Sequence, residues 1–250
     1  MGARAGCHLH VDPGRVSAPR PVTDVDLAET SLRDLNRMLH QARQGSFRVL
    51  NPRGAHAVAC GIDTDITVEV RGSVGYYCAG MHQKGSVHVD GNASTGLAEN
   101  IMSGTVRITG SATMSAGATG HGGLVVIEGN AGARCGISMK GVDIVVGGNV
   151  GHMSAFMAQA GNLVVLGDAG ADLGDSIYEA NLYVRGEVAS LGADAIRKDM
   201  RPEHVRTLSG LLDSAGMDAD PGDFKRYGTA RSLYNFHIDD IDAEVAGRAG

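Results

Sequence analysis

The sequence predicts an all-β protein, a right-handed parallel β-helix of about seven coils that are each nineteen residues long. First, seven glycines follow one another at intervals of nineteen residues without a slip. Second, aliphatic residues stand two and four positions before each glycine, and third, a small apolar residue stands two positions after it. A fixed period of this length is the signature of a solenoid. The glycines are Gly72, Gly91, Gly110, Gly129, Gly148, Gly167 and Gly186.

The two aliphatic columns are the predicted strands. All fourteen residues are aliphatic and twelve are β-branched, which favours extended structure. Positions two and four before the glycine share one face of a strand, because side chains alternate with a period of two. Nineteen residues leave no room for a crossover helix, so successive strands stack in parallel about 4.8 Å apart. The columns run from Val68 and Val70 to Leu182 and Val184.

Each glycine marks a corner of the predicted coil, where a side chain would cause strain. The residue directly after it is polar in every repeat, so this column can form hydrogen bonds along the stack. Its members are Ser73, Asn92, Ser111, Asn130, Asn149, Asp168 and Glu187.

Other interpretations of the glycines fit less well. A left-handed hexapeptide β-helix needs a sub-period of six, and calcium-binding repeats need a recurring Asp that no column supplies. The segments 129–136 and 167–174 look like dinucleotide fingerprints, but neither opens a helical pattern.

Both ends of a solenoid need a cover, and this need organises the rest of the chain. Residues 1–22 are interpreted as a mobile leader, and residues 23–46 as a capping region with a helix over 31–43. Residues 47–195 form the β-helix, with a degenerate first coil over 47–61. Residues 196–250 carry a helix that begins at Pro202 and stops at Gly216, followed by an extended interaction arm. Thr30 or Ser31 caps the first helix, whose apolar face is Leu32, Leu35, Met38, Leu39 and Ala42.

Composition indicates a reduced, cytoplasmic chain. Lys and Arg number 22 against 28 Asp and Glu, a net charge of −6, which argues against binding to nucleic acid or to an anionic membrane. No apolar stretch is long enough to span a bilayer, and the N-terminus has no secretory h-region. The four cysteines have neither a CxxC pair nor zinc spacing. Cys78 and Cys135 stand three coils, or roughly 14 Å, apart, which is too far for a disulfide.

The outward column three residues before each glycine changes character along the stack. Its early members, Glu69, His88 and Arg107, suit water. Its later members are Val126, Val145, Val164 and Tyr183. Four stacked apolar groups need a cover, and a partner subunit and the chain's own C-terminal arm are equally good candidates. Because the column points outward, a charge at Val145 is expected to disturb that cover and to spare the stacked core.

No catalytic, cofactor-binding or metal-ligating residue is predicted on this chain. One alternative is an autonomous carbohydrate-active β-helix enzyme. Asp172, Asp175 and Glu179 fall in one late coil and could mimic the carboxylate pair that cleaves polysaccharides.

Several segments carry a resemblance to a known family. They are GYYCAGM (75–81), AENIMSG (98–104), SAGATGHGGL (115–124), ARCGISMKGVDIVV (133–146), GHMSAFMAQAGNLVVLGDAG (151–170), GDSIYEANLYVRG (174–186) and FKRYGTARSLYNFH (224–237). The glycine repeat resembles the C-terminal GXGXG domain of the glutamate synthase large subunit and the glycine-repeat subunit of formylmethanofuran dehydrogenase. From about residue 23 onward, the chain resembles more closely the stand-alone GXGXG subunit of N-methylglutamate synthase, an enzyme of methylamine metabolism.

This resemblance implies a scaffold in a hetero-oligomer. The implied partners are a class II glutamine amidotransferase-like subunit and a glutamate synthase-like subunit, and the latter is expected to carry FMN and iron–sulfur clusters. The implied reaction converts L-glutamate and methylamine to N-methyl-L-glutamate and ammonia. The family assigns no catalytic residue to this subunit. A subunit of another glutamate synthase or amidotransferase complex is the nearest alternative.

Overall fold

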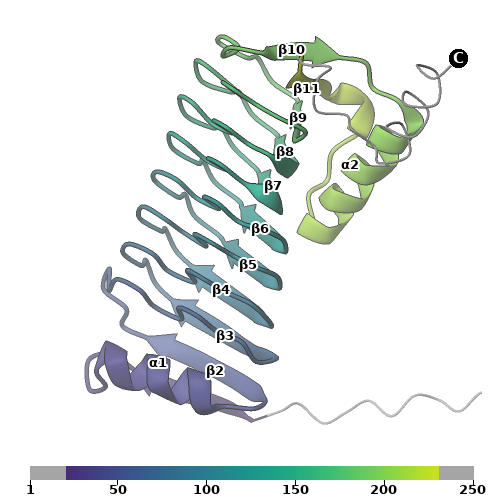
Figure 1. The fold of residues 1–250 in the computed structure, drawn as a ribbon. Helices are drawn as coiled ribbons and strands as arrows, with labels where there is room; N and C mark the ends of the chain where they lie inside the picture. The colour runs from purple at the N-terminus through teal and green to yellow at the C-terminus, as the bar shows by residue number, and fades with distance from the viewer. Residues whose placement is uncertain (1–20, 231–250) are drawn as a thin grey trace, which may run out of the picture.

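A computed structural model describes residues 21–230 of the chain as a stack of coils with one helix at its N-terminal end and a second helix beside its later strands (Figure 1). Residues 1–20 and 231–250 lie outside the described part, and so do most of the predicted leader and the end of the predicted arm. The sheet of the described residues has the order β1-β2-β3-β4-β5-β6-β7-β8-β9-β11-β10. The strands are β1 (Val22–Asp26), β2 (Gly45–Leu50), β3 (Ile66–Arg71), β4 (Ser86–Asp90), β5 (Thr105–Ile108), β6 (Leu124–Ile127), β7 (Lys140–Val146), β8 (Ala160–Val165), β9 (Asn181–Val184), β10 (Ala195–Lys198) and β11 (Lys225–Thr229).

The predicted register is confirmed from β3 to β9. Val68 pairs with Val87, Val87 with Val106, and the later neighbours in this column are again nineteen residues apart. Between β7 and β8 the register shifts at one point, where Lys140 pairs with Ala160, twenty residues on. The small residues after the corner form a second column of parallel bridges, from Val74–Ala93 to Ala169–Val188. Both columns belong to one continuous buried core. The nineteen-residue period therefore sets the architecture, because it returns the same side chain to the same place in every coil.

The corner glycines form one vertical column, as predicted. The amide of Gly110 donates to the carbonyl oxygen of Gly91 at 3.0 Å, and the same bond continues up to Gly186. The polar column beside them also bonds along the stack. The amide of Ser111 donates to Asn92 Oδ1 at 2.8 Å, and that of Asn149 donates to Asn130 Oδ1 at 2.8 Å. Each of these corner side chains thus accepts the backbone donor of the next coil.

The N-terminal end is covered by α1 (Leu32–Gln41), which confirms the predicted capping helix. Ser31 is its N-cap and accepts from the amide of Asp34. Leu35 and Leu39 are buried against the first coil, whereas Met38, expected on the same apolar face, is partly exposed. The Asn36 side chain donates to the carbonyl oxygen of Ala57 and accepts from the amide of Ala59. The helix therefore covers apolar side chains and also satisfies open backbone groups.

One strand at this end was not predicted. β1 begins at Val22 and pairs in parallel with β2, so the chain joins the sheet before α1 instead of after it. Its pairing extends from Val22–Ser46 to Asp26–Leu50. The predicted leader therefore extends one residue too far, and the predicted capping region over residues 23–46, in which the sequence indicates only a helix over 31–43, also contains most of β1 and the start of β2. The sequence VTDVD hides the strand, because only Val25 is buried and the alternation is too short to identify.

The C-terminal end departs further from expectation. The predicted helix is present as α2 (Pro202–Ala215), and Gly216 ends it in the left-handed conformation (φ 63°). The next residues do not form an extended arm: a 3₁₀ turn, η1 (Pro221–Asp223), leads into β11, which inserts between β9 and β10 and runs antiparallel to both. The arm prediction is therefore wrong for residues 221–229, since residues 221–223 form the turn and the backbone of residues 225–229 completes the sheet.

Candidate functional site

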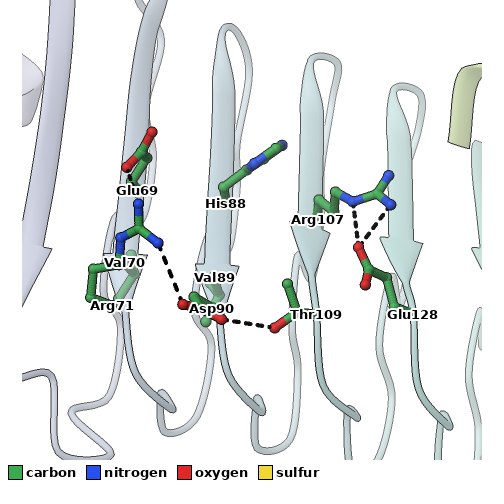
Figure 2. Close-up of a pocket in the computed structure, with 9 residues that line it drawn as sticks. All are labelled: Glu69, Val70, Arg71, His88, Val89, Asp90, Arg107, Thr109 and Glu128. Carbon is green, nitrogen blue, oxygen red and sulfur yellow. Dashed lines mark hydrogen bonds and ion pairs between the residues drawn. The ribbon is translucent and has the colours of Figure 1, made fainter. Parts of the chain in front are cut away.

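The outer face of the sheet is divided into a charged half and an apolar half, as the sequence predicts. A groove crosses the charged half over strands β3 to β6 (Figure 2). It is lined by Glu69, Val70, Arg71, His88, Val89, Asp90, Arg107, Thr109 and Glu128. The sequence analysis singled out Glu69, His88 and Arg107 but missed Arg71, Asp90 and Glu128. Each of these three residues directly precedes a corner glycine. The nineteen-residue period therefore places them in one column, and the sequence could have predicted that they lie together.

Opposite charges alternate along the groove. Arg71 lies 2.9 Å from Glu69 and 3.4 Å from Asp90, while Arg107 Nη2 lies 2.7 Å from Glu128 Oε1 (Figure 2). His88 projects from β4 between these two arginines. Exposed pairs of this kind contribute little stability, about 0–1 kcal/mol each. The groove is thus a polar surface whose charged side chains largely pair with one another.

The apolar half is covered by the chain itself, so a partner subunit is not the cover. Val126, Val145, Val164 and Tyr183 form a second core with α2 and the segment after it. The residues that cover them include Leu208, Leu212, Ala215 and Phe224. Burial raises the pKa of Tyr183 to about 12. This face is therefore not a docking site for a partner. Val145 lies outside the stacked core and packs against the residues that cover the outer face, which agrees with the expectation that a charge there disturbs the cover.

Arg107 joins the two halves. Its Nη1 donates to the carbonyl oxygen of Ala215 at 2.7 Å, and its Nε donates to Glu128 Oε1 at 2.8 Å. The carbonyl belongs to the last turn of α2, where a positive charge complements the helix dipole. One side chain therefore lines the groove and anchors the helix that covers the rest of the face.

The three carboxylates of the alternative enzyme hypothesis have separate environments. Asp172 Oδ2 lies 3.3 Å from His152 Nδ1, and the Asp172 amide donates to Ser190 Oγ at 2.9 Å. Asp175 accepts from the Ser176 hydroxyl at 2.8 Å. The amide of Glu179 donates to the carbonyl oxygen of Gln159 at 2.9 Å. None of the hydrogen bonds described for these three residues joins one carboxylate to another.

The described cysteines are free, as predicted. Cys78 and Cys135 are buried in the core, and burial raises the pKa of the Cys135 thiol to about 12. Cys7 lies outside the described residues. Over residues 21–230, no group of three or more His, Cys, Asp or Glu side chains could hold a metal ion. No helix in this part of the chain is both long enough and apolar enough to cross a bilayer.

The fold and its surfaces define a class of protein: a parallel β-helix with one helix over its N-terminal end, a second helix over part of its outer face, and a charged groove on the rest of that face. A comparison with profiles of known protein families finds no match. Among curated proteins the chain is similar to Protein GlxC of Rhizobium meliloti (strain 1021), with 63% identity over 224 residues. The match covers 88% of this chain and 98% of that protein. The chain therefore belongs to the GlxC family.

Proposed function

We propose that this chain is the non-catalytic scaffold subunit of a glutamate synthase-like complex, and specifically of N-methylglutamate synthase. The observation that carries the proposal is the GXGXG-type repeat, whose segments resemble the stand-alone β-helix subunit of that enzyme along nearly the whole chain. The repeat builds an uninterrupted stack from β2 to β9, and identity to Protein GlxC extends over most of the chain.

The physical case rests on rigidity. Every coil is joined to its neighbours by backbone hydrogen bonds, side-chain bonds at the corner and a continuous core. A rod of this kind holds whatever binds at two places on it at a constant separation. A nitrogen species passed between an amidotransferase-like subunit and a flavin-bearing subunit would need such a constant separation. The charged groove over β3 to β6 offers one surface on which a partner could dock.

Reconstitution of the complex tests this proposal. The chain is produced alone, with each partner, and with both, and N-methylglutamate formation from glutamate and methylamine is measured. We expect the isolated chain to be colourless and inactive, and activity to require both partners, with FMN and iron–sulfur clusters on the glutamate synthase-like subunit. A yellow preparation of this chain alone that turns over both substrates would refute the scaffold role.

The autonomous carbohydrate-active enzyme, with Asp172, Asp175 or Glu179 as its carboxylates, is the weaker candidate, because 63% identity to Protein GlxC over most of the chain favours the glutamate synthase-like family. A subunit of another glutamate synthase-like complex is the closer alternative. The same reconstitution distinguishes it, because ammonia or glutamine would then replace methylamine as the nitrogen donor that supports turnover.

A further inference from the structure

The C-terminal end of the stack carries a hollow of about 360 Å³ beside the β10–β11 pair. Four cationic residues line it, Arg197, Lys198, Lys225 and Arg226, together with one carboxylate, Asp199. A second hollow shares Lys198 and Arg226 with the first. Because side chains alternate along a strand, Lys198 and Arg226 share one face of the β10–β11 pair, whereas Arg197 and Lys225 lie on the other.

Arg226 is the central residue of this cluster. It stands opposite Tyr183 on β9 and opposite Lys198 on β10, so all three side chains lie on the same face of the sheet. Only 8% of its surface is exposed. Its Nε donates to the carbonyl oxygen of Asp199 at 2.9 Å and its Nη1 donates to Asn181 Oδ1 at 2.9 Å. Both acceptors are neutral.

Asp199 and Glu203 lie near enough to act on the pKa of Arg226, but neither bonds to its guanidinium through the carboxylate. Among residues 21–230, no carboxylate forms an ion pair with it, whereas Lys225 pairs with Glu187 at 3.0 Å. A buried charge that remains unpaired is costly, and burial accordingly lowers the pKa of the Arg226 guanidinium. The guanidinium has five N–H donors in a planar fork, and the two bonds described above leave donors for a further acceptor.

We propose that this hollow is a carboxylate-binding site, in which Arg226 supplies the planar donor fork and Lys198 a second positive charge. A carboxylate matches a guanidinium in shape and charge, and such charge-assisted pairs are about twice as strong as neutral hydrogen bonds. Lys198 Nζ already donates to the carbonyl oxygen of Thr229 at 2.9 Å, which fixes its position at the rim. This site does not depend on the complex proposed above.

Two sources could supply the carboxylate. One is a free small carboxylate, for which glutarate serves as the probe. The other is the chain itself, because Asp239, Asp240, Asp242 and Glu244 follow Ala230 by nine to fourteen residues. Nine extended residues can span about 30 Å, so these side chains are within reach of the hollow.

Thermal unfolding of the full-length chain in glutarate, against sodium chloride of equal ionic strength, tests the site. A carboxylate that binds only the folded chain raises Tm with the logarithm of its concentration. We expect Arg226→Gln to weaken glutarate binding about tenfold to a hundredfold, as for the loss of charge-assisted hydrogen bonds. Arg206→Gln, an exposed change on α2 that does not line the hollow, is the matched control. If Arg226→Gln does not fold, Arg226→Lys and Lys198→Gln replace it.

The full-length variant Asp239→Asn, Asp240→Asn, Asp242→Asn, Glu244→Gln separates the two sources. If the free carboxylate is the ligand, the wild-type chain and this variant respond to glutarate alike. If the chain's own acidic residues occupy the site, only the variant responds. The proposal is overturned if neither protein responds beyond the chloride control, or if Arg226→Lys and Lys198→Gln both leave the response unchanged.

Discussion

Individual residues make the coils stackable. At the corner, Gly110 lies so close to the coil below that an added Cβ would approach the carbonyl oxygen of Gly91 at 2.7 Å. On the turn side, the chain adopts the left-handed conformation at alternate positions, as at Tyr77, Ala79 and Met81 (φ 59°, 53° and 56°). The corner needs glycine because space is lacking, whereas the turn accommodates side chains because the neighbouring coils hold its backbone in place.

Two glycine substitutions distinguish the steric effect of an added methyl group from its effect on backbone conformational freedom. Gly110→Ala should destabilise the chain by about 1–3 kcal/mol, because the added methyl overpacks the corner. Gly210→Ala is the matched control, since it lies inside α2 with no heavy atom within 4 Å of the added Cβ. Alanine there should stabilise the helix by roughly 0.5–1 kcal/mol. Urea unfolding measures both, and equal effects of the two changes would contradict the close approach at the corner.

A second prediction at this scale concerns His82, which is buried with its Nε2 3.1 Å from the carbonyl oxygen of Gly85. Burial lowers its pKa below the ordinary value of 6.5, so the folded chain favours the neutral ring. The unfolded chain then binds more protons, and stability falls as the pH drops below about 6.5.

We therefore expect the urea midpoint to fall between about pH 7.5 and pH 5.5, and His82→Met to flatten that dependence. Met139 occupies the same inward column three coils later, so methionine fits this position in the repeat. His204, whose pKa burial also lowers, is retained in both proteins and cannot account for a difference between them. An unchanged slope in His82→Met would rule out His82 as the titrating group.

At the scale of elements, α2 and β11 complete the C-terminal end of the sheet. The helix covers the apolar half of the outer face, and β11 fills the place between β9 and β10. Deleting residues from Phe224 onward would therefore remove β11 and part of the core under α2. A loss of complex assembly in that variant could then come from unfolding and not from the loss of a C-terminal interaction arm. Residues 231–250 are the segment whose removal leaves the described elements whole.

Val145→Asp should be severely destabilising, by about 3–5 kcal/mol, because it removes a buried aliphatic side chain and buries a charge beneath α2. His88→Asp is the matched control, since it occupies the same column three coils earlier and is exposed in the groove. Its unfolding midpoint should stay close to that of the wild type. Limited proteolysis should release α2 from Val145→Asp first. Equal stability of the two variants would contradict the observed cover.

The whole molecule is a stack in which each coil contacts mainly its neighbours. Parallel pairing proceeds from β1 to β9 in chain order, so its long-range order is assembled from nearest-neighbour contacts. Each coil adds about 4.8 Å to the length of the stack along its axis. Removing one coil therefore changes the distance between the two ends without changing how the remaining coils pack, so the scaffold role can be tested separately from the fold.

Removing one complete coil should shorten the molecule without unfolding it. Excision of 73–91 joins Gly72 to Asn92 and keeps every column in register. Circular dichroism should retain the β signal, while the activity of the reconstituted complex should fall because the spacing between its sites changes. The excision also removes His88 and Asp90, so the full-length His88→Ala, Asp90→Ala variant controls for loss of the groove. Full activity of the shortened chain would contradict a spacing role.

The sequence by itself determined the stack. A period of nineteen residues with inward aliphatics, a corner glycine and a polar step specifies strand direction, register and the free state of Cys78 and Cys135, because each contact repeats between adjacent coils. Both helices were also predictable, since caps and apolar spacing are local signals. Only the tertiary structure decided what non-repeating segments contact. It placed β1 before α1, inserted β11 between β9 and β10, laid α2 over Val145 and Val164, and buried Arg226 with no ion-pair partner among residues 21–230. These contacts join residues that are far apart in the chain, and each occurs only once. A repeating sequence pattern therefore cannot predict them.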